Sequence, residues 1–389
     1  MLSLNKLTFT KLIILLLFVS CKESKPQKES LSKNNKPNIV YILADDLGYA
    51  EIGSYGQKHI KTPNLDALAK QGILFTDHYS GSPVCAPSRF SLLTGLHTGH
   101  GYIRGNDEWP SRGDVWDYKK SIENIKLEGQ RPIPDSTFTI GKMLQKNGYK
   151  TALVGKWGLG APNTGGVANK QGFDYFYGYM RHRDGHEHYP NEGIYRGKKS
   201  VWENKREITS GLDKCFTGDL WTANAKKWIT DQTKINQKPF FMFLSYDTPH
   251  AVLELPTQAY PKGGGLKGGL QWIGEDGNMI NTANGTPDSF THPDYKNATY
   301  DHDNDKTTPE MPWPETYKRY ATGVRRIDDS VGDIFQLLKD LNIDDNTLVV
   351  FSSDNGPSKE SYLPKSYVPN TPDFFDSFGP FDGIKRDVL

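Results

Sequence analysis

Four apolar runs, each followed by polar or charged residues, place the strongest constraint on the fold of this chain. The runs cover residues 38–44, 151–155, 240–245 and 347–352. Their apolar residues are consecutive rather than alternating, which is typical of strands buried on both faces of a parallel sheet. Helical patterns lie between them. We therefore predict an α/β domain with a doubly wound, mostly parallel sheet sandwiched by helices.

Three helices are predicted between or after these strands. Asn64 can cap a helix over 65–71 that Gly72 ends, and a helix over 139–147 ends at Gly148 in the same way. A third helix has one apolar face, formed by Val324, Ile327, Val331, Ile334, Leu338 and Leu341. Residues 256–314 are long and irregular, and are expected to form a rim around a functional site or a mobile insertion.

The residues that follow the four strands predict a shared site. They are Asp45, Asp46, Lys156, His250, Asp354 and Asn355. In open α/β sheets, ligands bind at the carboxyl ends of the strands. The carboxylate and amide oxygens among these residues suit Ca²⁺ or Mg²⁺ rather than zinc or copper. Lysine and histidine would add positive charge and a proton, so the set fits cleavage of an anionic ester.

A cysteine stands where a loop is predicted to enter a helix, in Cys85-Ala86-Pro87-Ser88-Arg89. Proline fits the first turn of a helix, so Cys85 would lie at a helix N-terminus beside Arg89, where an anion is favoured. Two interpretations remain open at this point: a reactive cysteine and a buried structural one.

The same pentapeptide resembles the C-x-P-S-R signature of the type I sulfatases. Residues 38–48, 155–160, 351–356 and 379–385 are similar to other segments of that family, so the resemblance runs from Pro37 to the end of the chain. It implies an alkaline-phosphatase-like sulfatase fold over residues 37–389. It also implies that a maturation enzyme oxidises Cys85 to formylglycine, the nucleophile that attacks a sulfate ester.

Residue roles follow from the resemblance by position. It assigns the metal, Ca²⁺ or Mg²⁺, to Asp45, Asp46, converted Cys85, Asp354 and Asn355. It makes Arg89 the group that stabilises the aldehyde hydrate. It assigns the sulfate to Lys156, His250 and Lys385, with His250 as proton donor to the leaving group.

This sequence departs from the family pattern in two places. Gly158 stands where the family usually has histidine. His97, His100 and Arg104 are candidates for its role, and a structural hydrogen bond is the alternative for each. The chain also stops at Leu389, whereas family members continue into a C-terminal antiparallel subdomain, which we expect to be missing here.

The N-terminus is predicted to be a targeting segment. Lys6 and Lys11 precede an apolar run over 12–19, which is too short to span a bilayer and is followed by Ser20 and Cys21. This resembles a bacterial lipobox, with an ordinary secretory signal as the alternative. We predict a lipoprotein signal over 1–20, a lipidated Cys21, a tether over 21–36 and a place in the bacterial cell envelope, at the outer membrane or cell surface. Cys215 would then have no disulfide partner.

The predicted function is hydrolysis of sulfate esters on a polysaccharide or oligosaccharide. Two alternatives remain: a catalytically impaired lipoprotein that binds sulfated glycans, and a related phosphoesterase, although Cys85 argues against the latter. With 47 basic and 46 acidic residues, no charge bias indicates nucleic acid. The histidine-rich segment 181–190 is expected to recognise sugar, to bind a second metal or to be a solvated loop.

Overall fold

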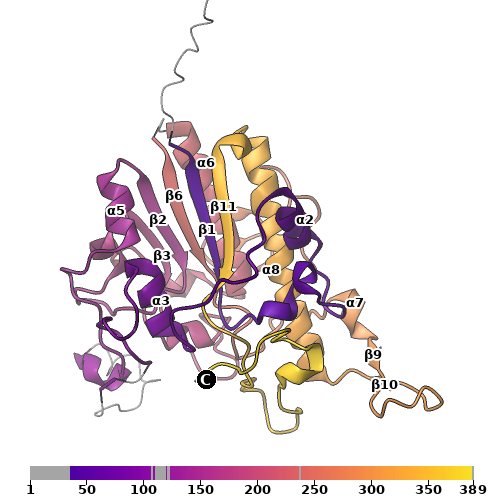
Figure 1. The fold of residues 1–389 in the computed structure, drawn as a ribbon. Coiled ribbons are helices and arrows are strands. Elements are labelled where there is room, and N and C mark those ends of the chain that lie inside the picture. The colour runs from indigo at the N-terminus through magenta and orange to yellow at the C-terminus, as the bar shows by residue number, and fades with distance from the viewer. Residues whose placement is uncertain (1–35, 107, 110–119, 121–122, 236–237, 388–389) are drawn as a thin grey trace, which may run out of the picture. The chain divides into compact units, whose positions relative to one another are not determined.

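A mostly parallel sheet is the framework of the computed structural model, which describes residues 36–389 except 107, 110–119, 121–122, 236–237 and 388–389 (Figure 1). Within those residues, one seven-stranded sheet has the order β11-β1-β6-β2-β3-β4-β5. Its strands are β1 (Asn38–Ala44), β2 (Lys150–Gly155), β3 (Tyr175–Tyr179), β4 (Val201–Glu203), β5 (Arg206–Glu207), β6 (Phe240–Ser245) and β11 (Thr347–Ser353). The pairs from β11 to β3 are parallel, and β4 and β5 add an antiparallel edge. The four predicted strands are confirmed.

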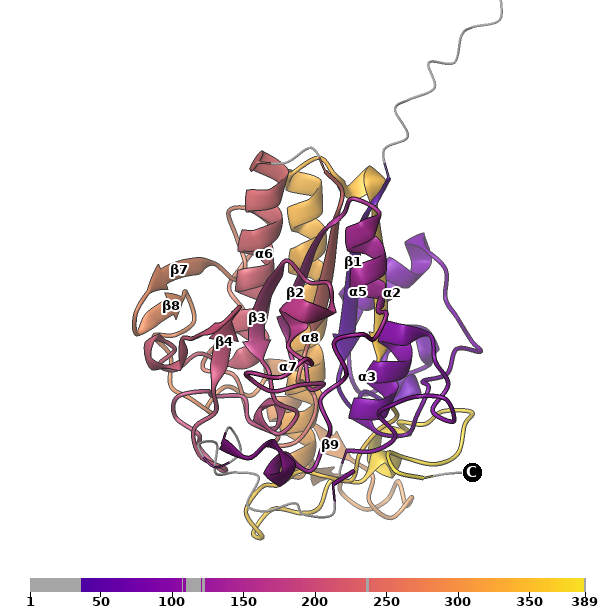
Figure 2. The ribbon, with the colours of Figure 1, turned by 90° about the vertical axis from the view of Figure 1, so that its left-hand side faces the viewer.

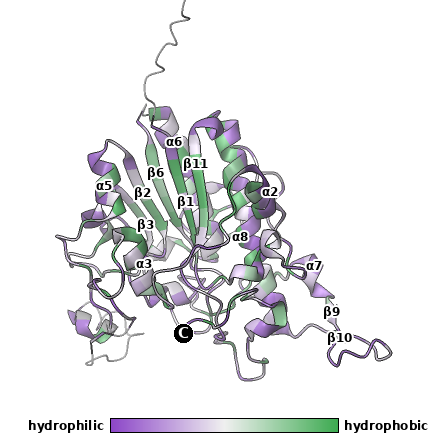
Figure 3. Ribbon diagram, in the orientation of Figure 1, coloured by the Kyte–Doolittle hydropathy of each residue, from purple (hydrophilic) through white to green (hydrophobic). Residues whose placement is uncertain are grey.

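Helices cover both faces of the sheet (Figure 2). On one face lie α2 (Pro63–Gln71), α6 (Thr217–Ile235) and α8 (Glu315–Asp340), and on the other lie α3 (Cys85–Thr94) and α5 (Ile140–Lys146). Successive side chains of a strand point to opposite faces. Ile42 of β1 therefore joins the core with α6 and α8, while Leu43 joins the core with α3 and α5. The apolar strands between polar helix surfaces are visible in Figure 3.

The predicted helices are confirmed, with one correction at a cap. Thr139 caps α5 by accepting from the Lys142 amide at 3.2 Å. Asn64, however, is not the cap of α2, which begins at Pro63. Instead Asp328 of α8 accepts from the Leu65 amide at 2.8 Å and from the Asn64 side chain at 2.9 Å. The carboxylate of Asp328 in α8 therefore caps the start of α2, in place of the local cap that the sequence predicts at Asn64.

The irregular segment 256–314 is largely built into the domain. It contains β7 (Trp272–Glu275), β8 (Asn278–Ile280), α7 (Pro293–Lys296), β9 (Thr299–Tyr300) and β10 (Met311–Pro312). Leu270, Ile280 and Tyr295 are buried in the core that includes α6 and α8. These contacts argue against a mobile insertion where the segment packs on the core, while residues 273–278 and 301–311 are exposed.

The predicted signal, Cys21 and all of the predicted tether except Lys36 lie outside the described residues. From Pro37 onward the chain forms one compact unit. No helix within the described part combines the length and the apolar character needed to cross a membrane.

Candidate active site

The carboxyl ends of four parallel strands bring the predicted site residues to one edge of the sheet. Ala44 pairs with Ser353, and Ser245 pairs with both Leu43 and Gly155. Because these registers align the strand ends, the residues that follow each strand begin at the same level. The shared site expected from the sequence is thus a consequence of the sheet's register.

Asp46 is the hub of the site. Its backbone is left-handed, with φ of 64°, which is uncommon for a residue other than glycine. The Asn355 side chain donates to Asp46 Oδ1 at 2.6 Å, and Lys385 Nζ donates to Oδ2 at 2.8 Å. Cys85 Sγ lies 3.9 Å from Oδ1. Residues far apart in the chain therefore meet on a single buried carboxylate.

Cys85 opens α3 and is fully buried. Burial, reinforced by the nearby charge of Asp45, raises the pKa of its thiol well above the usual value. Burial therefore favours the protonated thiol over the thiolate in the unconverted chain, despite the helix N-terminus. A protonated thiol among carboxylates needs either a cation beside it or chemical conversion before it can take part in catalysis.

Arg89, one turn along α3, contacts residues that follow three of the strands. Its Nε donates to Asp354 Oδ2 at 2.8 Å, and its Nη1 donates to the Lys156 carbonyl at 2.9 Å. Nη2 lies 3.5 Å from Asp45 Oδ2. The guanidinium thus ties the ends of β1, β2 and β11 together. The pKa of the Asp354 carboxyl is raised to about 7, mainly because the group is buried.

Lys156 follows β2 and is fully buried, with its ammonium on Asp45 Oδ2. Burial opposes ionisation of Asp45, but Lys156, His250 and Arg89 hold the pKa of its carboxyl well below the usual value. The loop after β3 encloses this lysine. A Cβ on Gly185 would lie 2.5 Å from Lys156 Cδ, so the close approach requires glycine.

Residues 181–190, which form that loop, are buried. The interpretation as a solvated loop is therefore wrong. His182 and His186 lie in edge contact, with ring centroids 5.1 Å apart, and His186 lies against His250. His188 is not part of this series of ring contacts. Its Nδ1 bonds to the Thr217 hydroxyl and its Nε2 to the backbone carbonyl of His250.

His250 follows β6 and lies beside Lys385. Lys385 Nζ donates to His250 Nε2 at 2.9 Å, and the other ring nitrogen contacts the Ala251 carbonyl. Burial and then the charge of Lys385 lower the pKa of His250 well below its usual value. Glu360 accepts from Lys385 Nζ at 3.1 Å and from Arg386 at 2.8 Å. Sequence reasoning missed Glu360, because no motif marks it and only the fold brings it here.

The residues present fit a divalent cation. Among the described residues, ligand atoms of Asp45, Asp46, Cys85 and His250 lie within 4.8 Å of one another. Asp45 Oδ1 and Asn355 Oδ1 are buried without a hydrogen-bond partner in the described structure. Buried polar atoms are normally satisfied, so these two orphaned oxygens indicate a ligand. The lysine ammonium groups that touch Asp45 and Asp46 show how strongly the site attracts positive charge.

The loop after α3 contains the three residues considered as substitutes for the histidine that the family usually has at position 158. His97 and His100 are exposed, and the Gly99 amide donates to His97 Nδ1 at 3.0 Å. Arg104 donates to the Gly101 and Gly99 carbonyls. The structural hydrogen bond offered as the alternative is thus present for His97 and Arg104, whereas the described structure gives none for the side chain of His100. Cys215 is buried, and within the described residues it forms no disulfide.

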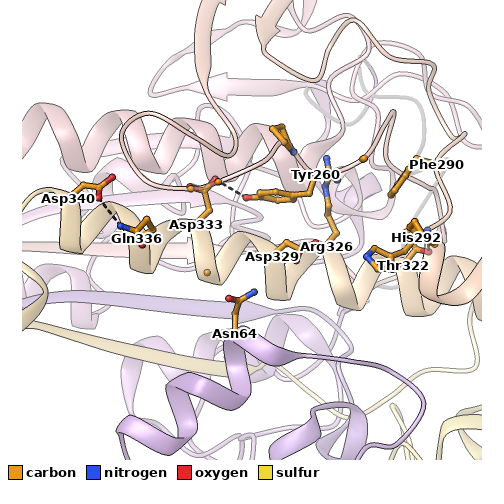
Figure 4. A pocket seen from close by; sticks show the side chains of 16 residues that line it. Asn64, Tyr260, Phe290, His292, Thr322, Arg326, Asp329, Asp333, Gln336 and Asp340 are labelled. Atoms are coloured by element: carbon orange, nitrogen blue, oxygen red, sulfur yellow. Dashed lines mark hydrogen bonds between the residues drawn. The ribbon is translucent and has the colours of Figure 1, made fainter.

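A cavity of about 710 Å³ lies elsewhere, along α8 (Figure 4). Its charged groups are already paired. Arg326 donates to both oxygens of Asp219, and Asp333 accepts from Tyr260 at 2.9 Å. None of the residues gathered at the strand ends lines it, so we do not assign it to the chemistry.

Comparison with known proteins decides the family. The family model described as Sulfatase matches residues 37–374. The chain belongs to the sulfatase family. The alkaline-phosphatase-like α/β fold expected from the sequence agrees with the sheet and its helices, and with the likeness to solved sulfatases.

Two sulfatases and one solved structure illustrate the likeness. The N-acetylgalactosamine-6-sulfatase of Rattus norvegicus is 30% identical over 362 residues, which are 90% of this chain and 56% of that protein. The N-acetylgalactosamine-6-O-sulfatase of Bacteroides thetaiotaomicron is 29% identical, over 88% of this chain and 63% of that protein. The crystal structure of Ps i-CgsB with k-i-k-neocarrahexaose has a TM-score of 0.59 at 29% identity, over 83% of this chain and 59% of that one. The chain thus spans little more than half the length of these relatives.

Proposed function

We propose that this sulfatase hydrolyses sulfate esters on a sulfated polysaccharide or oligosaccharide. The observation that carries the proposal is the position of Cys85. It lies in the Cys-Ala-Pro-Ser-Arg motif, buried 3.9 Å from Asp46, with the ammonium groups of Lys156 and Lys385 on the neighbouring carboxylates. A nucleophile formed there would have a cation site on one side and two groups that bind an anion beside it.

The carboxylates of Asp45 and Asp46, with Asp354 and Asn355, would hold Ca²⁺, for which oxygen ligands are preferred. Bound there, the cation would offset the charge of the sulfate, and the formylglycine made from Cys85 would supply the nucleophile. A dedicated maturation enzyme would perform that conversion.

The remaining residues would bind the sulfate group and protonate the leaving oxygen. Lys156 and Lys385 would bind the sulfate oxygens once a divalent cation takes over the carboxylates that they now contact. His250, whose Nδ1 contacts the Ala251 carbonyl and whose Nε2 faces Lys385, would protonate the leaving oxygen through Nε2. Arg89 would hold the strand ends in place through Asp354 and Asp45.

The relatives support a sugar substrate. Those named above act, by their names, on an N-acetylgalactosamine 6-sulfate, and the solved structure holds a neocarrahexaose. The predicted lipidation of Cys21 would place the enzyme at the bacterial cell envelope, where such polymers are met. The impaired, glycan-binding alternative differs in one property, since it would bind a sulfated glycan without releasing sulfate.

The test combines conversion with turnover. The chain would be expressed with and without a formylglycine-generating enzyme, and the peptide containing residue 85 examined by mass spectrometry. The converted protein would then be assayed for sulfate release from defined sulfated oligosaccharides and for phosphate release from phosphate esters. Conversion with sulfate release supports the proposal. An intact thiol after co-expression, or binding without release, rejects it, and faster phosphate release would favour the phosphoesterase.

A further inference from the structure

Gly158 and His182 occupy one small region beside Lys156. The Gly158 amide donates to the Met180 carbonyl at 3.3 Å, which continues the pairing of β2 with β3 past the ends of both strands. This brings residue 158 level with the start of the loop over 181–190. A Cβ built on Gly158 would lie 3.5 Å from His182 Nδ1 and 3.7 Å from its Cα. The imidazole of His182 therefore stands next to where a side chain at position 158 would begin.

The ring of His182 is buried but unsatisfied. The residue is 1% exposed, and neither Nδ1 nor Nε2 has a hydrogen-bond partner within the described structure. Other loop groups do have partners: His188 is bonded through both ring nitrogens. A buried imidazole without partners is costly, so it indicates that something binds there when the enzyme works.

Charged groups of the site act electrostatically on this ring. Burial, then the charges of Lys156 and Arg183, lower the pKa of His182 well below its usual value, while Asp45 acts in the opposite direction. Burial and these positive charges therefore favour the neutral imidazole, in which one nitrogen keeps a lone pair. His186 lies between it and His250, with ring centroids 5.1 Å from His182 and 4.2 Å from His250.

We propose that His182 is the imidazole that replaces the missing side chain at position 158 and serves the reaction as a proton acceptor. It would take a proton from a hydroxyl at the reaction centre, where an N–H bond forms as the O–H bond breaks, and would release that proton to water. The inference rests on the proposed sulfatase function. It places the residue that completes the site on the loop after β3 rather than on the strand-end motif after β2.

The first experiment compares His182→Gln with the native chain, both converted at Cys85. Glutamine preserves much of the volume but cannot accept a proton near neutral pH. The kcat for 4-nitrophenyl sulfate should fall by roughly 10²- to 10⁴-fold, the range for general acid–base groups. Inorganic sulfate should bind the unconverted variant and the unconverted native chain equally in calorimetry. The matched control, His100→Gln on the exposed loop, should change neither value.

The second experiment moves the imidazole. Gly158→His alone should lower both the melting temperature and kcat, because the φ of 75° at this position strains any residue but glycine and because the new ring meets that of His182. The double variant Gly158→His/His182→Gly should regain part of both losses. This exchange decides the matter even if His182→Gln folds poorly.

Three results would overturn the inference: an unchanged kcat in His182→Gln, a loss of sulfate affinity as large as the loss of kcat, or additive effects in the exchange. Lack of sulfate release by the native chain would instead reject the proposed function. In that case the melting temperatures of the exchange would still show whether the two positions share one space, and additivity there would still overturn the inference.

Discussion

The imidazole of His186 stacks on that of His250, with ring centroids 4.2 Å apart and planes 26° from parallel. The Nδ1 of His250 contacts the carbonyl of Ala251 in its own backbone. Together these contacts fix the ring, so that Nε2 faces Lys385 at 2.9 Å and Asp46 at 3.5 Å. One nitrogen of His250 is thus aimed at the place where the sulfate ester would bind.

This geometry predicts that His250 matters most for poor leaving groups. A sugar alkoxide needs a proton when it leaves, whereas an activated phenol does not. His250→Ala should therefore reduce hydrolysis of a sulfated sugar by roughly 10²- to 10⁴-fold and that of 4-nitrophenyl sulfate much less. Lys156→Ala should impair both substrates, and His97→Ala on the exposed loop should impair neither. Equal losses for His250→Ala on both substrates would mean that it binds sulfate only.

Metal retention should depend on Asp46. The native chain should keep one calcium after dialysis, measured by elemental analysis, and calcium should raise its melting temperature. Saturation at about 100 times Kd would add about 2.7 kcal/mol of stability. Asp46→Ala should lose both effects, while Asp303→Asn in the exposed segment 301–311 should keep them. Stoichiometric zinc with no calcium would contradict this prediction.

Gly185→Ala should displace Lys156. The added Cβ would lie 2.5 Å from Lys156 Cδ, so the lysine must move away from Asp45. We expect weaker binding of inorganic sulfate, measured by calorimetry, and lower activity on every sulfate ester. Gly323→Ala in α8 is the control, because its Cβ would meet Pro249 at an ordinary 3.9 Å and alanine favours a helix. Equal sulfate affinity in both variants would show that Lys156 does not bind sulfate.

Asp328 predicts a pH dependence of stability. Burial raises the pKa of its carboxyl from 3.8 to about 6. The folded chain therefore keeps this proton up to about pH 6, whereas the unfolded chain loses it near 3.8. Its contribution is most favourable below pH 3.8 and is lost as the pH rises through 6, by an amount on the order of 3 kcal/mol.

Asparagine at position 328 cannot ionise, so the variant removes this dependence. Urea unfolding at pH 4 to 7 should show Asp328→Asn gaining stability relative to the native chain as the pH rises. The exposed Asp345→Asn is the control for the loss of one charge. A constant difference between Asp328→Asn and the native chain would show that the native carboxyl is not perturbed.

The sequence alone predicted four of the seven strands of the sheet and most of the candidate site. Buried parallel strands require runs of apolar residues, so β1, β2, β6 and β11 could be recognised locally. Their carboxyl ends share an edge, which is why the order of strands and charged residues along the chain was enough to group Asp45, Lys156 and Asp354. The aromatic strand β3 cannot be predicted in the same way, because Gly178 interrupts its short run of apolar residues.

Tertiary structure decided the contacts that no local pattern encodes. Asp328 caps α2 from another helix, and Glu360 reaches Lys385 from a loop. The same holds for His182, which lies beside Gly158 only because β2 and β3 pair beyond their ends. The protonation of Cys85 also depends on its surroundings. A helix N-terminus favours an anion, but burial among carboxylates outweighs it, and burial is a property of the folded chain.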